Sequence, residues 1–562
     1  MEEIYKKWLS LNLPNDLQEE LQLISGDDKA IEDCFYQYVS FGTGGMRGVL
    51  GAGTNRMNIY TIRRVSEGLA RYIESNGQDA KQRGVVLAYD TRHFSHEFAV
   101  ETASVLGAHG ITTYIYKESR PTPQLSFTVR ELNAFAGVVI TASHNPKQYN
   151  GFKVYGEDGA QLVPNGAKEI VAHMEQIEDI FEIETSNIQQ LEKQELVHWI
   201  LDEMDSKYVS NLLTLKDNSA IDTSMNIVYT PLHGAGLVPV TEGLKQFGFQ
   251  NVHTVQEQAI QDGSFPTVSY PNPEEPAAFK LAMELGNCVR ADLLLATDPD
   301  ADRLGVAVRN GENYELLTGN QLGALLLHYI LQTNVNNGTL PSNGVVIKTI
   351  VTAELGAKVA AHYNIETINT LTGFKYIAEK IEEFEKSAER TYLFGYEESY
   401  GYLIKTFARD KDAVQVALKV AEMAAHYRTK GQSLLDVLQE LYKQFGYHRE
   451  ALVSRVFEGK DGQEQMKDIL NKLRENQPSE IAGIPVARVE DYLTSVASLA
   501  DGTQEDILLP KENVLKYVLA NDAWIAIRPS GTEPKCKYYF GVVGASAHEA
   551  EQLLSDLKNS FS

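Results

Sequence analysis

The chain has 562 residues, of which 43% are hydrophobic and 23% are charged, and its formal net charge is −25. This length exceeds what one hydrophobic core can organise, so we expect three to four domains. The acidic balance excludes a general binder of nucleic acid or of an acidic membrane surface, because phosphate groups are held by basic protein surfaces. A small phosphorylated substrate stays compatible with this charge, since it needs only a few local Arg and Lys side chains.

The cysteines and the first residues bear on the compartment. Cys34, Cys288 and Cys536 are odd in number and far apart in the chain, which argues against a disulfide framework or a structural zinc site. The beginning, MEEIYKKWLSLNLP, lacks the apolar region of a signal peptide. No run of about 18 apolar residues occurs anywhere. We therefore expect a cytoplasmic protein without a membrane partner.

A glycine-rich segment comes early in the chain. FGTGGMRG, residues 41–48, places Arg47 among four glycines. One interpretation is a basic loop that contacts the phosphate of a substrate. The alternative is a flexible turn with one exposed Arg.

Three stretches of the chain then share one layout, in which a short apolar strand, a helical stretch and a second strand follow one another. The first and second strands of the three stretches begin at Val85 and Ile111, at Asn226 and Asn251, and at Val345 and Ile365. Each stretch then reaches a further strand with a polar loop, namely VVITASHNP from Val138, LLLATDPDADR from Leu293 and YLFGYEESYG from Tyr392. This spacing is typical of parallel βαβ units, and its recurrence predicts one α/β scaffold used three times.

The last part of the chain differs from these repeats. The segment from EDILLPKENV onward contains strands without the repeated layout, and a helical stretch, SAHEAEQLLSDLKNSF, ends the chain. We expect a smaller α+β domain here. The predicted architecture is α/β, with three related domains that have mixed sheets and a smaller C-terminal domain. The predicted boundaries are 1–205, 206–318, 319–443 and 444–562.

The loop TASHNPKQYNGFK, residues 141–153, is the most informative segment of the chain. It follows the apolar run Gly137–Ile140 and places the Ser143 hydroxyl at the end of a buried strand. Ligands of open α/β sheets bind at the carboxyl ends of the strands. Lys153 could move protons or balance charge there. His144 could do either, but a structural hydrogen-bonding role is at least as reasonable.

The loop DPDADR, residues 298–303, follows the buried strand that begins at Leu293. Asp298, Asp300 and Asp302 alternate, so an extended loop turns the three carboxylates to one side. Three hard oxygen ligands suit Mg²⁺, which also binds phosphate oxygens. The alternatives are a solvated acidic turn and a Ca²⁺ loop, and the sequence lacks the Gly and distal Glu of an EF-hand. Arg303 directly after the carboxylates favours a site for a phosphoryl group.

Two further segments could contact the rest of a ligand. GYEESYGY, residues 395–402, offers Glu397 and Ser399, a carboxylate and a hydroxyl suited to sugar hydroxyls. A charged hairpin tip is the alternative for this segment taken alone. TLTGFKYI, residues 370–377, offers a flexible turn and a cation through Thr372, Gly373 and Lys375.

The segment RPSGTEPK, residues 528–535, has the composition of an anion-binding loop. Arg528 can hold a phosphate in a fork, and Lys535 adds a second cation. Ser530, Gly531 and Thr532 add hydroxyls and freely oriented backbone amides. An ordinary surface turn would also use Pro, Ser and Gly, but the two cations and two hydroxyls favour phosphate binding.

The four loops SHNP, DPDADR, EES and RPSGTEPK occur in an order and at spacings that resemble the α-D-phosphohexomutase superfamily over nearly the whole chain. The resemblance implies four domains around a central cleft, a phosphoserine at Ser143, and Mg²⁺ held by Asp298, Asp300, Asp302 and the phosphate on Ser143. It also implies a sugar-binding loop at Glu397 and Ser399. The mobile phosphate-binding loop of the family matches Arg528, Ser530, Gly531 and Thr532.

Within this superfamily, FGTGGMRG and GYEESYGYL are similar to the branch that contains bacterial α-phosphoglucomutases and the vertebrate phosphopentomutase and glucose-1,6-bisphosphate synthase. Tyr396 stands where the family commonly has glycine. The resemblance implies interconversion of glucose 1-phosphate and glucose 6-phosphate, with glucose 1,6-bisphosphate as intermediate and activator. The expected partners are small sugar phosphates, and the expected state is a monomer or weak dimer.

Other activities stay open from the sequence. Pentose or mannose phosphates are alternative substrates. A metal-dependent phosphatase would also phosphorylate a serine, but it needs to hold one phosphate, and the second phosphate loop at residues 528–535 disfavours it. A catalytically silent sugar-phosphate sensor is disfavoured because the catalytic residue types are all present.

Overall fold

The computed structural model describes the chain apart from residues 43, 218–220, 458–467, 530–534 and 562. The chain forms two compact units. Unit 1 contains Met1–Gly319, Ala378–Ala388 and Ser399–Gly431, and unit 2 contains Asn320–Ile377, Glu389–Glu398 and Gln432–Ser562. Among the described residues, no helix is both long and apolar enough to cross a membrane.

Unit 1 begins with three short helices that have a core of their own. They are α1 (Glu2–Ser10), α2 (Asn15–Leu23) and α3 (Asp28–Phe35). Trp8 is buried at the centre of this cluster, and its ring meets the rings of Phe35 and Tyr60 edge to face at centroid distances of 5.7 and 5.5 Å. Because Tyr60 lies on the first long helix of the following α/β layer, the cluster is anchored to that layer.

The first sheet has the strand order β1-β5-β4-β2-β3-β6. Its strands are β1 (Gly45–Val49), β2 (Val85–Tyr89), β3 (Thr113–Tyr116), β4 (Ala136–Ile140), β5 (Tyr149–Tyr155) and β6 (Val197–Ile200). β2, β3, β4 and β6 are parallel, whereas β5 runs antiparallel to both β4 and β1. β2 and β4 are buried along their whole length, which explains their continuous apolar sequences.

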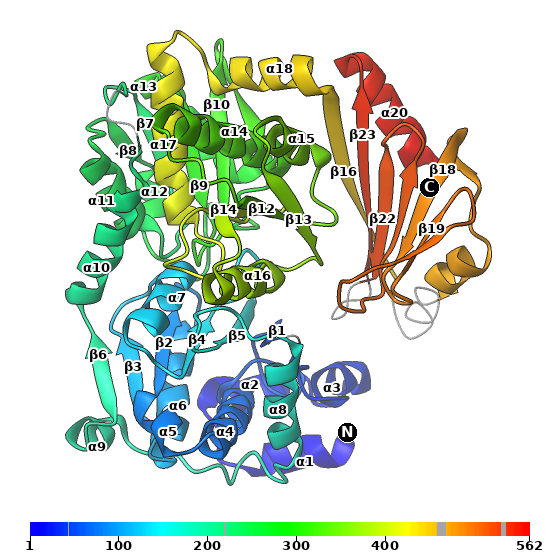
Figure 1. The fold of residues 1–562 in the computed structure, drawn as a ribbon. Coiled ribbons are helices and arrows are strands. Elements are labelled where there is room, and N and C mark those ends of the chain that lie inside the picture. Colours follow the sequence, from blue (N-terminus) through cyan, green and yellow to red (C-terminus); the bar gives the residue numbers. More distant parts are fainter. Residues whose placement is uncertain (43, 218–220, 458–467, 530–534, 562) are drawn as a thin grey trace. The chain divides into compact units, whose positions relative to one another are not determined.

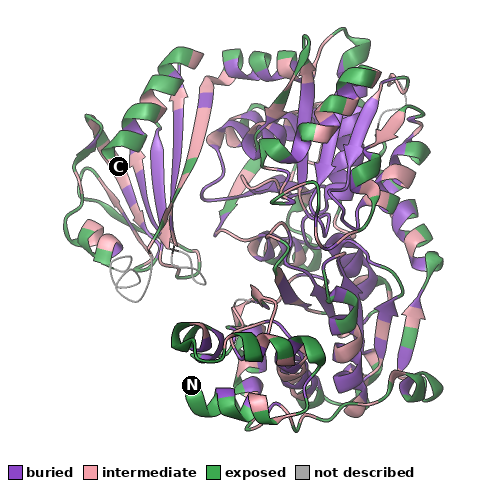
Figure 2. Ribbon diagram, turned by 180° about the vertical axis from the view of Figure 1, so that it is seen from behind, coloured by how far each residue is buried: buried purple, intermediate pink, exposed green. Residues whose placement is uncertain are grey.

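Helices cover this sheet (Figure 1). The helices of this part of unit 1 are α4 (Ile59–Ser75), α5 (Gln78–Arg83), α6 (Ser95–Ala108), α7 (Thr122–Glu131), α8 (Pro164–Glu175), α9 (Ile188–Lys193) and α10 (Asp202–Leu212). α6 and α7 pack on β2 and β4, whereas α10 packs against α7. α4 begins at a capping box in which Asn58 and Thr61 bind each other's backbone N–H groups, which satisfies donors that a helix start leaves open. The buried core between helices and sheet contains residues such as Ile62, Leu87 and Val138, and the strands lie in the buried interior in Figure 2.

The second sheet, also in unit 1, has the order β11-β10-β9-β7-β8. Its elements in chain order are η1 (Leu213–Leu215), β7 (Ile227–Thr230), α11 (Leu237–Phe247), β8 (Val252–Thr254), α12 (Gln256–Ala259), η2 (Pro276–Phe279), α13 (Lys280–Val289), β9 (Leu293–Thr297), β10 (Leu304–Asn310) and β11 (Asn313–Leu317). β7, β8 and β9 are parallel, and β10 and β11 are antiparallel additions.

The third α/β layer lies mainly in unit 2. Its elements are α14 (Gly319–Asn337), β12 (Gly344–Thr349), α15 (Glu354–His362), β13 (Glu366–Thr370), α16 (Phe374–Ser387), β14 (Thr391–Tyr396), β15 (Tyr402–Leu403), α17 (Ala413–Thr429) and α18 (Leu434–Phe445). β12 lies between β13 and β14 and is parallel to both.

The predicted threefold repeat is confirmed by these topologies. The orders β3-β2-β4, β8-β7-β9 and β13-β12-β14 are the same arrangement, with the first strand of each repeat in the middle and all pairs parallel. The loops SHNP, DPDADR and EES therefore follow equivalent strands, β4, β9 and β14. All three loops leave the carboxyl end of the last of three parallel strands, where ligands of open α/β sheets commonly bind.

The C-terminal part of unit 2 is a different, antiparallel sheet with the order β16-β23-β22-β21-β18-β19-β20, and β17 pairs with β18. Its elements are β16 (Tyr447–Val456), β17 (Glu480–Ile481), β18 (Ile484–Asp491), β19 (Val496–Leu499), β20 (Gln504–Asp506), β21 (Leu515–Leu519), β22 (Trp524–Pro529), β23 (Lys535–Gly544) and α20 (Ala547–Ser560). α20 packs on this sheet (Figure 1). The α/β class and the smaller C-terminal domain predicted from the sequence are confirmed.

Candidate active site

Unit 1 brings the serine loop and the acidic loop together. Ser143 follows β4, and its Oγ donates a hydrogen bond of 2.8 Å to Asp298 Oδ2, which follows β9. Ser143 has a φ of 53°, in the left-handed region, where a non-glycine residue costs about 1–2 kcal/mol. This backbone directs a buried hydroxyl at a buried carboxylate, and surrounding hydrogen bonds must hold it there.

Asp298, Asp300 and Asp302 form a buried carboxylate triad, with one oxygen of each within 4.8 Å of the others. Asp298 Oδ1 accepts from the backbone N–H groups of Asp302 (3.2 Å) and Arg303 (3.1 Å), so the loop curls around its first residue. Burial, together with the charges of Asp300 and Asp302, raises the pKa of Asp298 well above its usual value. Three carboxylates in so small a volume repel one another unless a cation lies among them.

The triad fits a hard divalent cation. Asp300 Oδ1 and Asp302 Oδ1 are buried and have no hydrogen-bond partner among the described residues. Buried carboxylate oxygens without a donor are costly, and a metal ion would satisfy them. The all-oxygen donor set is the kind that Mg²⁺ prefers. The residues present are therefore compatible with the magnesium that the sequence predicted.

Two lysines balance the triad. Lys153, on β5, places Nζ 3.1 Å from Asp300 Oδ2 and 3.7 Å from Asp302 Oδ2. Lys411, which the sequence analysis did not single out, places Nζ 3.1 Å from Asp302 Oδ2 and 2.8 Å from Asp410 Oδ1. Burial alone would raise the pKa of Asp302, but the charges of Lys411, Lys153 and Arg303 lower it.

The remaining predicted residues of unit 1 surround the same loops. His144 Nδ1 lies 3.2 Å from Ser143 Oγ, and burial together with the charges of Arg303 and Arg47 holds the pKa of His144 well below its usual value. A neutral imidazole therefore faces the hydroxyl at pH 7. Arg47 Nη1 donates to Asn145 Oδ1 at 3.1 Å.

Arg303 lies beside the triad, with its Nε 3.8 Å from Asp302 Oδ1. Its Nη1 donates to Glu274 Oε1 and to the backbone carbonyl of Ser399, both at 2.9 Å. Ser399 is therefore held in unit 1 through its main chain. Through this hydrogen bond, Arg303 of the acidic loop holds Ser399, which directly follows Glu397 and Glu398.

In unit 2, the predicted sugar loop and the TLTG turn meet. Gly373 has a φ of +121°, which favours glycine, and its N–H donates to Glu397 Oε1 at 3.1 Å. Thr372 Oγ1 is buried without a hydrogen-bond partner in the described part of the chain. Lys375 Nζ lies 5.0 Å from the ring centroid of Tyr376. The structure thus brings Gly373, and with it the neighbouring Thr372, to Glu397.

The beginning of the predicted phosphate loop, residues 528–535, is also in unit 2. Arg528, near the end of β22, donates from Nε to Glu512 Oε1 at 2.8 Å and also hydrogen-bonds the Tyr539 hydroxyl. Burial and the negative charges of Glu398 and Glu397 raise the pKa of Tyr539, whereas the positive charge of Arg528 opposes this rise. Arg528 and the carboxylates of the predicted sugar loop therefore both lie near the Tyr539 hydroxyl. Lys535 begins β23, and Ser530, Gly531 and Thr532 lie outside the described residues.

Tyr396, the unusual residue before the EES loop, belongs to the core. Its side chain is 1% exposed and stacks on Phe394 with ring centroids 5.3 Å apart. A Cβ added at Gly323 would lie 2.3 Å from the Tyr396 ring, and one at Gly356 would lie 2.0 Å from its hydroxyl oxygen. Two helix glycines thus make room for this ring, so Tyr396 is a packing residue.

This fit predicts a reversal of the usual glycine effect in a helix. Gly→Ala in an open helix gains about 1 kcal/mol, but overpacking costs about 1–3 kcal/mol. We expect Gly356→Ala to lower the melting temperature, as measured by calorimetry. Tyr396→Phe should restore part of this loss, because it removes the hydroxyl that the new methyl group would meet. The single change Tyr396→Phe should be neutral or stabilising, since that hydroxyl has no hydrogen-bond partner in the described structure. Additive effects of the two changes would contradict this packing.

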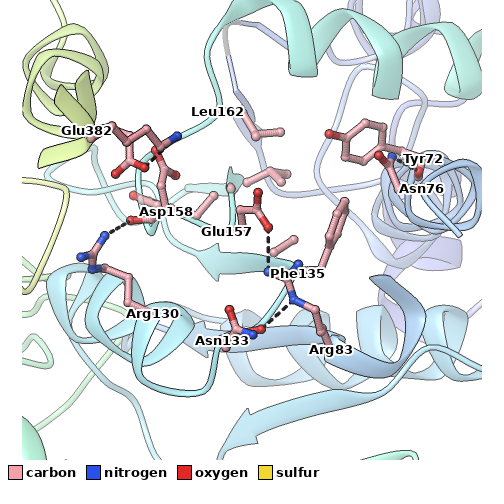
Figure 3. Close-up of a pocket in the computed structure, with 15 residues that line it drawn as sticks. Tyr72, Asn76, Arg83, Arg130, Asn133, Phe135, Glu157, Asp158, Leu162 and Glu382 are labelled. Carbon is pink, nitrogen blue, oxygen red and sulfur yellow. Dashed lines mark hydrogen bonds and ion pairs between the residues drawn. The ribbon is translucent and has the colours of Figure 1, made fainter. Parts of the chain in front are cut away.

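Figure 3 shows a separate pocket of unit 1, of about 520 Å³, beside β5 and α7. Its charged groups already pair with each other, for example Arg83 with Glu157 at 2.7 Å and Lys386 with Glu382 at 3.0 Å. The pocket contains none of the residues predicted for the site.

Comparison with known proteins agrees with this geometry. Four models of phosphoglucomutase/phosphomannomutase domains match in order: α/β/α domain I at residues 39–180, domain II at 206–311, domain III at 318–445 and the C-terminal domain at 479–559. The chain belongs to the phosphoglucomutase/phosphomannomutase family.

Some of the similar proteins carry names of individual enzymes. A protein named phosphoglucomutase from Staphylococcus haemolyticus is 39% identical over 94% of each chain. One of the same name from Staphylococcus epidermidis is 40% identical over 89% of this chain and 90% of its own. The fold matches a crystal structure of a putative phosphomannomutase from Thermus thermophilus with a TM-score of 0.68 and 22% identity, over 93% of this chain and 98% of the other.

Proposed function

We propose that this chain interconverts α-D-glucose 1-phosphate and glucose 6-phosphate. The observation that carries the proposal is the Ser143 hydroxyl, held 2.8 Å from Asp298 in a buried carboxylate triad flanked by Lys153 and Lys411. A serine in such a place can carry a phosphoryl group between two positions of a sugar. The name shared by relatives of 39–40% identity supports glucose phosphates as substrates.

In the proposed reaction, Ser143 carries a phosphoryl group at the outset. A free sugar hydroxyl attacks the phosphorus, its new P–O bond forms, and the P–Oγ bond of Ser143 breaks. The sugar hydroxyl gives up its proton to a base, Oγ regains a proton, and the product is glucose 1,6-bisphosphate. After this intermediate reorients, its other phosphoryl group passes to Oγ in the reverse sequence. Because the second half-reaction restores phosphoserine, one serine serves both.

The residues around Ser143 have distinct tasks in this proposal. Neutral His144, at 3.2 Å, can take or return the proton of Oγ. Lys153 and Lys411 supply positive charge beside the triad and can exchange protons with the sugar hydroxyl. Asp298, Asp300 and Asp302 would hold Mg²⁺, with the phosphate on Ser143 as a further ligand. When bound, this ion would offset negative charge on the phosphoryl oxygens.

The family resemblance implies further substrate-binding residues. Glu397 and the neighbouring Thr372, Gly373 and Lys375 offer a carboxylate, a hydroxyl, an amide and a cation for sugar hydroxyls or phosphate. Arg528 and Lys535 would hold the phosphate that does not react. Arg47 is a separate candidate for a phosphate contact. Ser399, Ser530, Gly531 and Thr532 keep the substrate-binding roles that the family resemblance implies.

A coupled assay tests the function. Purified protein is given glucose 1-phosphate, Mg²⁺ and a trace of glucose 1,6-bisphosphate, and glucose 6-phosphate is followed through its dehydrogenase. Parallel reactions contain mannose 1-phosphate or ribose 1-phosphate. We expect the highest kcat/KM for the glucose phosphate. A faster reaction with ribose or mannose phosphate would reassign the substrate, and release of inorganic phosphate faster than isomerisation would favour a phosphatase.

Arg528→Ala should impair use of the substrate through its non-reacting phosphate. A charge-assisted contact contributes about 1.5–3 kcal/mol, so kcat/KM should fall about tenfold to hundredfold. Phosphorylation of Ser143 should survive, and the bisphosphate intermediate should escape more often, as measured by its accumulation in solution. The matched control is Arg474→Ala, since Arg474 lies in a helical segment and its Nε contacts Asp491, at the end of β18 of the same sheet, at 3.1 Å without belonging to the phosphate loop. Wild-type release of the intermediate with unchanged KM would show that this loop does not hold the distal phosphate.

A further inference from the structure

Arg92 lies beneath the serine loop and holds its main chain. This residue follows β2, the strand next to β4, and its side chain is fully buried. Nη1 donates to the carbonyls of Pro146 at 2.9 Å and Tyr149 at 3.0 Å, and Nη2 donates to the carbonyls of Ser143 at 2.6 Å and Asn145. One guanidinium thus satisfies four carbonyls along residues 143–149, a segment without helix or strand up to residue 148.

A second set of bonds holds the other side of the loop. Asp90 Oδ2 accepts from Thr141 Oγ1 at 2.6 Å and lies 3.2 Å from Arg92 Nε. Thr141 Oγ1 in turn accepts from the backbone N–H of Ser143 at 2.8 Å. Both the N–H and the carbonyl of Ser143 are therefore bound by one buried network. Because Ser143 is in the left-handed region, this network is what keeps its hydroxyl directed at Asp298.

The network also reaches the second α/β layer of unit 1. The Phe265 ring lies 4.9 Å from the Arg92 guanidinium carbon. Next to it, a Cβ at Gly263 would lie only 2.4 Å from the backbone N of His93, so the two main chains approach closely. The acidic loop belongs to that same second layer, so Arg92 contacts both layers that contribute to the site.

We infer that Arg92, with Asp90 and Thr141, is a positioning residue for the phosphoryl-carrying serine. It touches neither the hydroxyl nor the carboxylate triad, and it acts by fixing the backbone that aims Ser143 Oγ. This inference rests on the proposed function only where it is tested by the rate of glucose 1-phosphate isomerisation. A lysine at position 92 would keep the charge but has a single terminal nitrogen in place of the planar fork, so it cannot reach four separate carbonyls.

The test compares Arg92→Lys with wild type in the glucose 1-phosphate assay and in a direct measurement of Ser143 phosphorylation. Misplacement of a reacting group by about 1 Å costs about a hundredfold. We expect kcat to fall about a hundredfold while KM for glucose 1-phosphate changes less than about threefold, since substrate contacts lie elsewhere. The rate at which glucose 1,6-bisphosphate phosphorylates Ser143, followed by intact mass, should fall in parallel.

Two further variants keep the inference falsifiable. Thr141→Val removes two hydrogen bonds of the network, to Asp90 and from the Ser143 N–H, at nearly constant shape. It leaves the four carbonyl contacts of Arg92 in place, so we expect a smaller loss of kcat, again without a change in KM. Arg309→Lys is the matched control, because Arg309 also donates to two main-chain carbonyls, Ala291 at 2.8 Å and Gly286 at 3.0 Å, away from the serine loop. Its kcat should equal that of wild type.

The outcomes separate the two proposals. A folded Arg92→Lys protein with wild-type kcat and phosphorylation rate would overturn the positioning role, whatever the substrate. If Arg92→Lys fails to fold, an unchanged kcat for Thr141→Val would overturn it instead. Wild-type protein that does not isomerise glucose 1-phosphate but phosphorylates Ser143 would refute the proposed substrate and leave the phosphorylation test of Arg92 in force.

Discussion

Ser143→Ala should abolish isomerisation of glucose 1-phosphate, with a loss of at least about a thousandfold, because the covalent carrier of the phosphoryl group is removed. The change deletes an oxygen that donates to Asp298 Oδ2, and it leaves Thr141, Arg92 and the backbone of the loop in place. The melting temperature should therefore change little. Intact-mass measurement should show one phosphoryl adduct on the wild type and none on the variant.

The matched control for this experiment is Ser264→Ala. Ser264 Oγ also has a histidine partner, His93 Nε2, at 2.9 Å, but it has no carboxylate triad beside it. We expect Ser264→Ala to keep both the adduct and the activity. An active Ser143→Ala enzyme, or an adduct that persists in it, would show that another residue carries the phosphoryl group.

Removal of the divalent ion, or of one of its carboxylates, should have the second largest effect. We expect a chelator to stop the wild-type reaction and added Mg²⁺ to restore it. Asp300→Asn should weaken Mg²⁺ binding by about a hundredfold, because it removes one of three ligand charges and leaves the shape of the side chain. Titration calorimetry measures this affinity directly, without any substrate.

The structure indicates that Asp300→Asn will fold. Asp300 Oδ2 accepts from Thr122 Oγ1 at 2.8 Å, and an asparagine oxygen can keep this bond. Lys153 loses a charged partner but stays 3.7 Å from Asp302. The control is Asp292→Asn, just before β9 and outside the triad, which should bind Mg²⁺ as wild type does. Wild-type activity that resists chelation would refute a metal role for the loop.

The sequence predicted the central pair of the site for a physical reason. Ser143 and Asp298 lie far apart in the chain, yet each follows the last parallel strand of an equivalent repeat. Parallel strands have their carboxyl ends at the same edge of the sheet, and ligands of open α/β sheets bind at that edge. The apolar segments before both loops are recognisable as buried strands from their composition. The fold class and the positions of these two loops were therefore predictable.

Arg92 and Asp90 could have been found by the same rule. The segment DTRH follows β2, a buried apolar strand, so its charged residues stand at a carboxyl strand end as those of DPDADR do. Lys411 offered no such signal, because it lies in an irregular segment between β15 and α17. Its approach to Asp302 depends on tertiary packing, which local patterns do not encode.

Tyr396 is a residue whose surroundings the sequence could not show. It stands next to Glu397, and neighbouring residues of an extended chain point to opposite faces. The space that accepts its ring comes from Gly323 on α14 and Gly356 on α15. No pattern within the EES segment could show that two distant helix glycines receive this side chain.

The division of the chain between its two compact units also bears on how the protein is made. The polypeptide passes from one unit to the other after residues 319, 377, 388, 398 and 431. α17, which is buried along most of its length and packs through Leu418 against Gly243 of α11, belongs to unit 1 but leaves the ribosome after the first part of unit 2. Neither unit can be completed while the other is still absent from the nascent chain. Unit 1 can therefore be completed only after residue 431 has been synthesised, and a nascent chain stopped at residue 319 would leave the face of α11 around Gly243 without its contact to Leu418.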